Sequence, residues 1–214
     1  MNPLIEQIRL IKTGTAAEVK AAQKLVEKYW HRSCQERELR RDFEAFKAEA
    51  ADFDAITDRD HKAYFINTLK WVIWGMGLEN FKFWENFLIK CVLDQDGKIR
   101  MAAIRAAEYL LIEIDDYLEK GSYVPADFSE EKARVARALY AQLLIRVGKL
   151  IDAHYEPRFR RCKYLDSLPV GIYKSLQQFY DALVPSEHYE RVAQRSIAEN
   201  TPPTPSFPPI FGRA

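Results

Sequence analysis

The chain has 214 residues, of which 48% are hydrophobic and 29% charged, and its 32 basic residues nearly balance its 31 acidic ones. Such a length can bury a substantial core, and this composition with only eight glycines disfavours a disordered or β-rich chain. No apolar run is long enough to predict a membrane span or a secretory signal. Three widely spaced cysteines argue against a disulfide framework, so we expect a cytoplasmic protein.

Amphipathic helices are predicted along the first half of the chain. Apolar periodicity and capping residues place these helices near 2–12, 15–31, 35–51, 58–75, 79–93 and 98–118. The fold class expected from this pattern is all-α.

The second half begins after a loop predicted at Gly121–Phe128. A helix starting at Asp127 or Ser129 follows, and its core stripe consists of Ala136, Tyr140, Leu143, Val147 and Leu150. Pro157 and Pro169 then interrupt the pattern before a final helical pair near 170–183 and 186–199. We predict one domain over 1–200, clearer in 1–120 and more divergent in 127–200, with a proline-rich tail over 201–214.

The clearest helix pair surrounds a tight turn within residues 88–110. Asp94 and Asp96 can accept hydrogen bonds from free N–H groups at the start of the second helix. Apolar residues then recur at steps of three and four, at Ile99, Ala102, Ala103, Ala106, Leu110 and Ile114. The opposite side is predicted to carry Lys98, Arg100, Arg105 and Glu108. An antiparallel hairpin with a close, alanine-lined contact is therefore expected.

This turn and helix resemble those of a HEAT repeat. The resemblance rests on Asp94, Asp96, the aliphatic-basic pair Ile99-Arg100, and the following alanines. A weaker copy in residues 14–25 has the pair Val19-Lys20 and a capping box of Thr15 and Glu18. Val19 and Ile99 are 80 residues apart, two periods of about 40. The middle copy, near Thr57–Lys62, can cap a helix but lacks the aliphatic-Arg pair.

The resemblance implies a right-handed α-α superhelix of stacked antiparallel helix pairs, as in HEAT and armadillo proteins. Stacked repeats together with the absence of catalytic motifs lead us to expect a non-catalytic module for protein interaction or scaffolding, whose partner is another protein. No cofactor, metal or membrane contact is expected. Fold alone does not assign a function.

A dense aromatic group lies in residues 71–87, and two roles are open for it. It comprises Trp71, Trp74, Phe81, Phe83, Trp84 and Phe87. Interior packing is the favoured interpretation. In the alternative, Trp71, Trp74, Phe83, Trp84 and Phe87 line an exposed groove that binds a partner, because large apolar patches on soluble proteins usually mark interaction sites.

Charge is distributed unevenly along the chain. Residues 34–60 include five basic and nine acidic residues, a net charge of −4, whereas residues 132–163 include nine basic and two acidic ones, a net charge of +7. Within the basic segment, Arg158, Arg160, Arg161 and Lys163 alternate with aromatic residues, a pattern that can bind phosphate and stack bases. The favoured interpretation is a solvated surface, and the alternative is a site for nucleic acid or another anion.

Enzyme signatures are weak, which favours a non-catalytic role. The sequence lacks a P-loop, a dinucleotide-binding glycine motif and a nucleophile elbow, and His31 with Cys34 has no second ligand pair for a metal. One enzymatic alternative remains by analogy, since some bacterial alkylpurine DNA glycosylases are built from HEAT-like repeats. It requires Glu79 or Glu85 to act as the acid beside Trp84, with the basic segment folded across the same face.

Overall fold

The computed structural model describes residues 3–33, 43–73, 77–115, 117, 128–161 and 168–184. These residues form eight α-helices and three short 3-10 helices, and none of them lies in a β-strand. The protein is therefore all-α over its described part, as the sequence predicted. The predicted helix at 186–199, the tail at 201–214 and the start of the helix at 35–51 lie outside the described residues.

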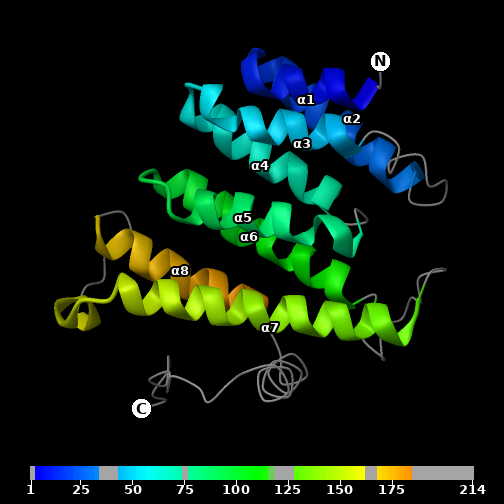
Figure 1. Ribbon diagram of the computed structural model, residues 1–214. Helices are drawn as coiled ribbons and strands as arrows, with labels where there is room; N and C mark the ends of the chain where they lie inside the picture. Colours follow the sequence, from blue (N-terminus) through cyan, green and yellow to red (C-terminus); the bar gives the residue numbers. More distant parts are fainter. Residues whose placement is uncertain are drawn as a thin grey trace.

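The helices follow one another in pairs that are stacked along the molecule (Figure 1). The first two pairs consist of α1 (Pro3–Thr13), α2 (Ala16–Ser33), α3 (Phe43–Ala51) and α4 (Arg59–Ile73), with the 3-10 helix η2 at Asp52–Ala55. The third pair consists of η3 (Leu78–Asn80), α5 (Phe81–Val92) and α6 (Gly97–Asp115). The fourth consists of α7 (Glu130–Ala153), η4 (Pro157–Arg161) and α8 (Val170–Leu183).

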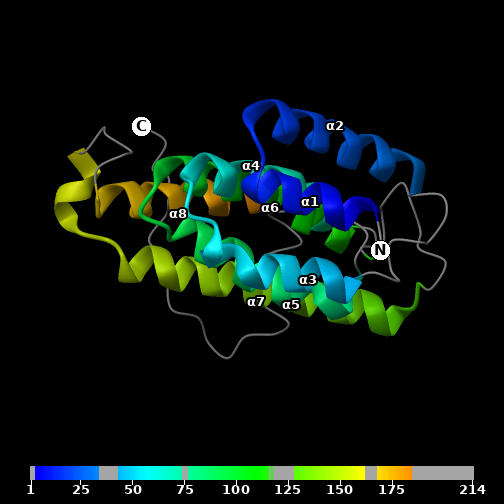
Figure 2. The same cartoon turned by 90° about the horizontal axis from the view of Figure 1, so that it is seen from above.

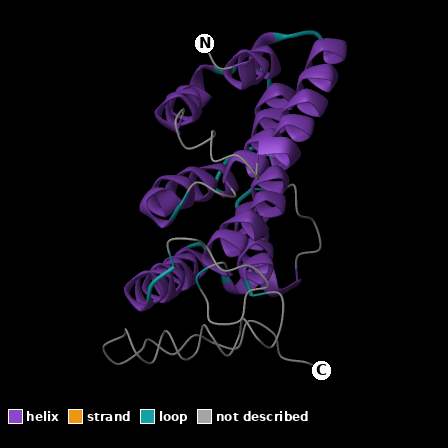
Figure 3. Ribbon diagram, turned by 90° about the vertical axis from the view of Figure 1, so that its right-hand side faces the viewer, coloured by secondary structure: helices purple, strands orange, loops and turns teal. Residues whose placement is uncertain are grey.

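Successive pairs place their second helices side by side. Helix α6 packs against both α4 and α8, and α2 packs against α4. Viewed from above, α4, α6 and α8 lie in one column, whereas α3, α5 and α7 lie in the other (Figure 2). The side view shows the same stacking of helices along the length of the molecule (Figure 3). One face of the stack is thus formed by the second helix of each pair.

Capping residues start several helices where the sequence predicted. The carboxylate of Asp58 accepts hydrogen bonds from the N–H groups of Asp60 and His61, at 2.8 and 2.9 Å. Glu18 Oε2 accepts a hydrogen bond from the Thr15 N–H at 2.7 Å, and Thr15 Oγ1 lies 3.4 Å from the Glu18 nitrogen, so the predicted capping box is confirmed. These bonds satisfy N–H groups that have no partner within the first helical turn.

The alanine-rich seam is buried as predicted. The side chains of Ile99, Ala102, Ala103, Ala106, Leu110 and Ile114 are each at most 2% exposed. Val19 of α2 is equally buried. Small alanines bring α6 close to its neighbours, and four helices, α4, α5, α7 and α8, contact it.

The position of Arg100 differs from the prediction. The helical period placed it on the solvent side of α6, but it is only 1% exposed. Its Nη1 donates hydrogen bonds to the carbonyl oxygens of Asp94 and Gln95, at 3.0 and 2.8 Å. Its Nε donates to Ser175 Oγ on α8, at 2.9 Å. The side chain is buried because these acceptors replace water around the guanidinium.

None of the helices in the described ranges is both long and apolar enough to cross a lipid bilayer.

Candidate functional site

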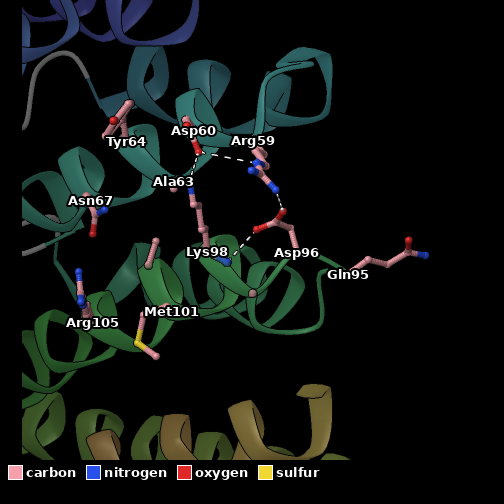
Figure 4. Close-up of a pocket in the computed structure, with 12 residues that line it drawn as sticks. Arg59, Asp60, Ala63, Tyr64, Asn67, Gln95, Asp96, Lys98, Met101 and Arg105 are labelled. Carbon is pink, nitrogen blue, oxygen red and sulfur yellow. Dashed lines mark hydrogen bonds and ion pairs between the residues drawn. The ribbon is translucent and has the colours of Figure 1, made fainter. Parts of the chain in front are cut away.

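An open groove lies between the N-terminal halves of α4 and α6 (Figure 4). Its volume is about 710 Å³. The walls are formed by Arg59, Asp60, Ala63, Tyr64 and Asn67 of α4, and by Gln95, Asp96, Gly97, Lys98, Met101, Ala102 and Arg105 of α6 and its preceding turn. The groove therefore belongs to the face formed by the second helices.

Helical spacing explains why these side chains share one face. Asp60, Tyr64 and Asn67 are at positions i, i+4 and i+7 of α4. Lys98, Met101 and Arg105 are at positions i, i+3 and i+7 of α6. Both helices begin at an aspartate cap. The solvent-facing side chains of their first turns line the two walls of the groove.

Ion pairs join the two helices at one end of the groove. Lys98 Nζ lies 2.7 Å from Asp60 Oδ1, and Arg59 Nη1 lies 3.7 Å from Asp96 Oδ2. A third, longer pair joins Arg59 to Asp60 at 3.9 Å. Because these groups are largely exposed, each pair stabilises the fold by at most about 1 kcal/mol. Their main effect is to neutralise the charges at this end.

The other end of the groove is apolar and carries an uncompensated charge. Tyr64 is 39% exposed and Met101 37% exposed, two of the few large hydrophobic side chains that face solvent. Arg105 is also exposed, and within the described residues it makes no ion pair or hydrogen bond. Asn67, on the α4 wall, lies at the same end of the groove as Arg105 on the α6 wall (Figure 4). This end therefore offers a cation and two apolar contacts to a ligand.

The aromatic residues proposed for a partner-binding groove lie mostly in the core. Trp84 is 1% exposed and Phe87 is 7% exposed, and Phe83 is partly buried against them. Phe87 makes edge-to-face contacts with Phe53 at 5.3 Å and with Trp84 at 5.9 Å between ring centroids. The exposed-groove alternative is thus corrected for Trp84 and Phe87, because both rings are buried and in contact with each other and Phe87 also packs on Phe53 of η2.

Trp71 and Trp74 complete the set of residues proposed for that exposed groove. Trp71 lies in α4, but its side chain is outside the described residues, as is Trp74. In the sequence, position 71 continues the spacing of Asp60, Tyr64 and Asn67.

The basic group proposed for an anion site is described only in part. Arg158 is exposed, lies 2.6 Å from Glu156 Oε2 and stacks on the Phe159 ring at 5.5 Å from its centroid. The side chains of Arg160 and Arg161, and the whole of Lys163, lie outside the described residues.

The candidate acid Glu85 is a buried ion-pair partner. Its side chain is 0% exposed, and its two oxygens lie 2.7 Å from Lys82 Nζ and 2.8 Å from Arg146 Nη1. Arg146 also donates a hydrogen bond to Asn86 Oδ1 at 2.5 Å. Glu85 therefore cannot meet a substrate, which corrects that part of the glycosylase alternative. Glu79, the other candidate, is exposed on η3.

Other chemistry-bearing groups do not form a reactive site in the described ranges. Nowhere in them do three His, Cys, Asp or Glu side chains gather as they would to hold a metal ion. Cys91 is fully buried, and this burial raises the pKa of its thiol, so the reactive thiolate is disfavoured.

Comparison of the chain with protein-family models, with curated proteins and with solved structures finds no match. The groove between α4 and α6 is defined by its own side chains alone. It was not predicted from the sequence, although one signal for it exists: Met101 lies between Lys98 and Arg105 on the polar side of an otherwise regular helix.

Proposed function

We propose that this chain is a non-catalytic, HEAT-like helical-repeat module that binds another protein through the α4–α6 groove. The stacked order of its helix pairs and the burial of both Val19 and Ile99 support the repeat interpretation. Repeats of this kind build one extended surface from equivalent helices, and such surfaces commonly bind partners.

The single observation that carries the proposal is the exposure of Tyr64 and Met101 within the groove. Both side chains leave over a third of their surface in solvent, although most large apolar residues of the described chain are buried. Tyrosine, methionine and arginine are enriched where proteins meet, since they combine apolar area with specific polar contacts. The groove brings all three together at Tyr64, Met101 and Arg105.

The mixed charge of the groove supports a protein partner over a nucleic acid. Asp60 and Asp96 contribute carboxylates to the same walls as Arg59, Lys98 and Arg105. A nucleic acid gains most of its affinity from neutralising phosphates, and two of the three cations in these walls are already paired with carboxylates. Proteins, in contrast, commonly bind through patches in which both signs of charge surround an apolar centre.

The proposal is tested by affinity purification with quantitative mass spectrometry. The tagged chain is compared with a Tyr64→Ser/Met101→Ser variant and with a matched control, Val135→Ser, which replaces a side chain on α7 that is 43% exposed. At least one protein is expected to be retained by the parent and the control and reduced about tenfold by the groove variant. Circular dichroism checks that all three are folded. Identical partners for all three would contradict the proposed site.

A further inference from the structure

The α4–α6 groove has a positive charge that its own carboxylates do not neutralise. Asp60 and Asp96 pair with Lys98 and Arg59, at 2.7 and 3.7 Å. Arg105 faces the same groove and has no such partner within the described residues. A guanidinium that is exposed beside apolar groups can donate two parallel hydrogen bonds to an incoming carboxylate.

Two of the three helices beside the groove carry a net positive charge. Helix α2, which packs against α4, has four basic and two acidic residues, a net charge of +2. Helix α4 has three basic residues and one acidic, also a net charge of +2. Helix α6, which forms the other wall, has three basic and three acidic residues and is neutral. The excess positive charge on this face therefore lies on α2 and α4, and together with Arg105 in the groove it favours acidic ligands.

We propose, on the basis of the function proposed above, that the partner presents an acidic segment with a neighbouring apolar side chain to this groove. One carboxylate of the segment accepts hydrogen bonds from Arg105. The apolar neighbour contacts Tyr64 and Met101. At the ion-paired end, Lys98 and Arg59 already pair with Asp60 and Asp96, so this end attracts a second negative group only weakly and the groove favours a single carboxylate over a continuous polyanion.

The test uses peptides selected from a random peptide library displayed on phage. The parent chain is the bait, and the selected peptides are then synthesised and their affinities measured by fluorescence anisotropy. We expect selected sequences in which Asp or Glu stands beside a large apolar residue. Replacing that acidic residue by its amide should weaken binding about tenfold or more, since a charge-assisted hydrogen bond is lost.

Variants of the chain test the role of Arg105 directly. Arg105→Gln should lower the affinity for the acidic peptides about tenfold, and Arg105→Glu should lower it further. Arg105→Lys should retain part of the affinity. The matched control is Arg134→Gln, which neutralises an exposed arginine on α7 and should leave the affinity unchanged. Single-stranded and duplex oligonucleotides of random sequence are measured alongside.

The possible outcomes separate this inference from the proposed function. Peptides that require Tyr64 and Met101 but show no acidic preference, or do not respond to Arg105→Gln, overturn the acidic-partner inference and leave the interaction site standing. Peptides that bind the Tyr64→Ser/Met101→Ser variant as tightly as the parent overturn both the acidic-partner inference and the proposed interaction site. A selection that yields no binding peptide overturns both as well. An oligonucleotide that binds the parent tightly and loses affinity in Arg105→Gln overturns the protein partner in favour of a nucleic acid.

Discussion

Arg100 Nε donates a hydrogen bond to Ser175 Oγ over 2.9 Å, although the two residues are 75 positions apart in the chain. The same guanidinium donates to the carbonyl oxygens of Asp94 and Gln95 in the turn before α6. A single buried side chain therefore connects the α5–α6 turn to helix α8, and with it the third helix pair to the fourth. This contact holds α6 in position, and α6 forms one wall of the groove.

Replacing Arg100 by methionine should lower the free energy of unfolding by about 3 kcal/mol, because two carbonyl groups and one hydroxyl lose a buried donor. Ser175→Ala should cost only about 1 kcal/mol, since the bonds to the turn remain. Urea denaturation monitored by circular dichroism measures both. Arg105→Met is the control, and as an exposed substitution it should change stability by less than about 0.5 kcal/mol. Equal effects at positions 100 and 105 would contradict a structural role for the buried contacts.

Removing the buried carboxylate of Glu85 should also destabilise the fold. Glu85→Ala deprives Lys82 and Arg146 of their partner, but these cations are 46% and 42% exposed and can be hydrated, so we expect a cost of about 1 to 2 kcal/mol. Arg146→Ala should cost less, because its side chain is 42% exposed and Lys82 still pairs with the carboxylate. A double-mutant cycle should give a coupling energy of about 1 kcal/mol between Glu85 and Arg146. A coupling near zero would mean that the ion pair does not join α5 to α7 in solution.

Stability should depend on the ionisation of Glu49, which links α3 to α1. Burial alone raises the pKa of this carboxyl, but hydrogen bonds from Lys12 Nζ and Arg9 Nε, both at 2.7 Å, outweigh it and hold the pKa below 4.5. A carboxyl whose pKa is lower in the folded state stabilises the fold above its unfolded pKa. That contribution is lost as the pH falls through the folded pKa.

We therefore expect Glu49→Gln to lower the free energy of unfolding by about 2 kcal/mol at neutral pH, with the difference shrinking as the pH falls below 4.5. Urea denaturation across a pH series measures this difference. Glu6→Gln, at an exposed position of α1, provides the control. A difference between Glu49→Gln and the parent that stays constant down to acid pH would show that Glu49 ionisation does not contribute.

The basic segment provides the test of the nucleic-acid alternative. Arg158, Arg160, Arg161 and Lys163 are replaced by glutamine together, and duplex DNA binding is measured by fluorescence anisotropy at low and moderate salt. A protein-interaction module should show weak binding that this neutralisation hardly changes. Affinity that falls steeply with salt and disappears in the neutralised variant would favour phosphate recognition.

The starts of the helices and their buried stripes were predictable, because both depend on residues close together in the sequence. The start of α4 at Arg59 and of α7 at Glu130 depend on caps by Asp58 and Ser129, which act within three residues. The buried stripe of α7, at Ala136, Tyr140, Leu143 and Val147, depends on the helical period alone. Leu150, the last predicted member of this stripe, is partly buried at the end of the helix.

The candidate site could not be predicted in the same way. Tyr64 and Met101 are 37 residues apart, and their shared exposure depends on how α4 and α6 pack, which no local pattern encodes. Arg100 and Glu85 look like surface residues in the sequence, but partners on other helices bury them. Helical periodicity predicts that a charged residue faces solvent, because it takes no account of a hydrogen-bond or ion-pair partner that is distant in sequence.

The sequence by itself determined that the described chain is helical, where most of these helices begin and which stripe of each is apolar, because these properties depend on neighbours three or four positions away. Only the tertiary structure decided that Trp84 and Phe87 fill the core and that a cation and two apolar side chains share an open groove. Those outcomes arise from contacts between helices distant in sequence, where the fit of side chains and the pairing of charges select one arrangement.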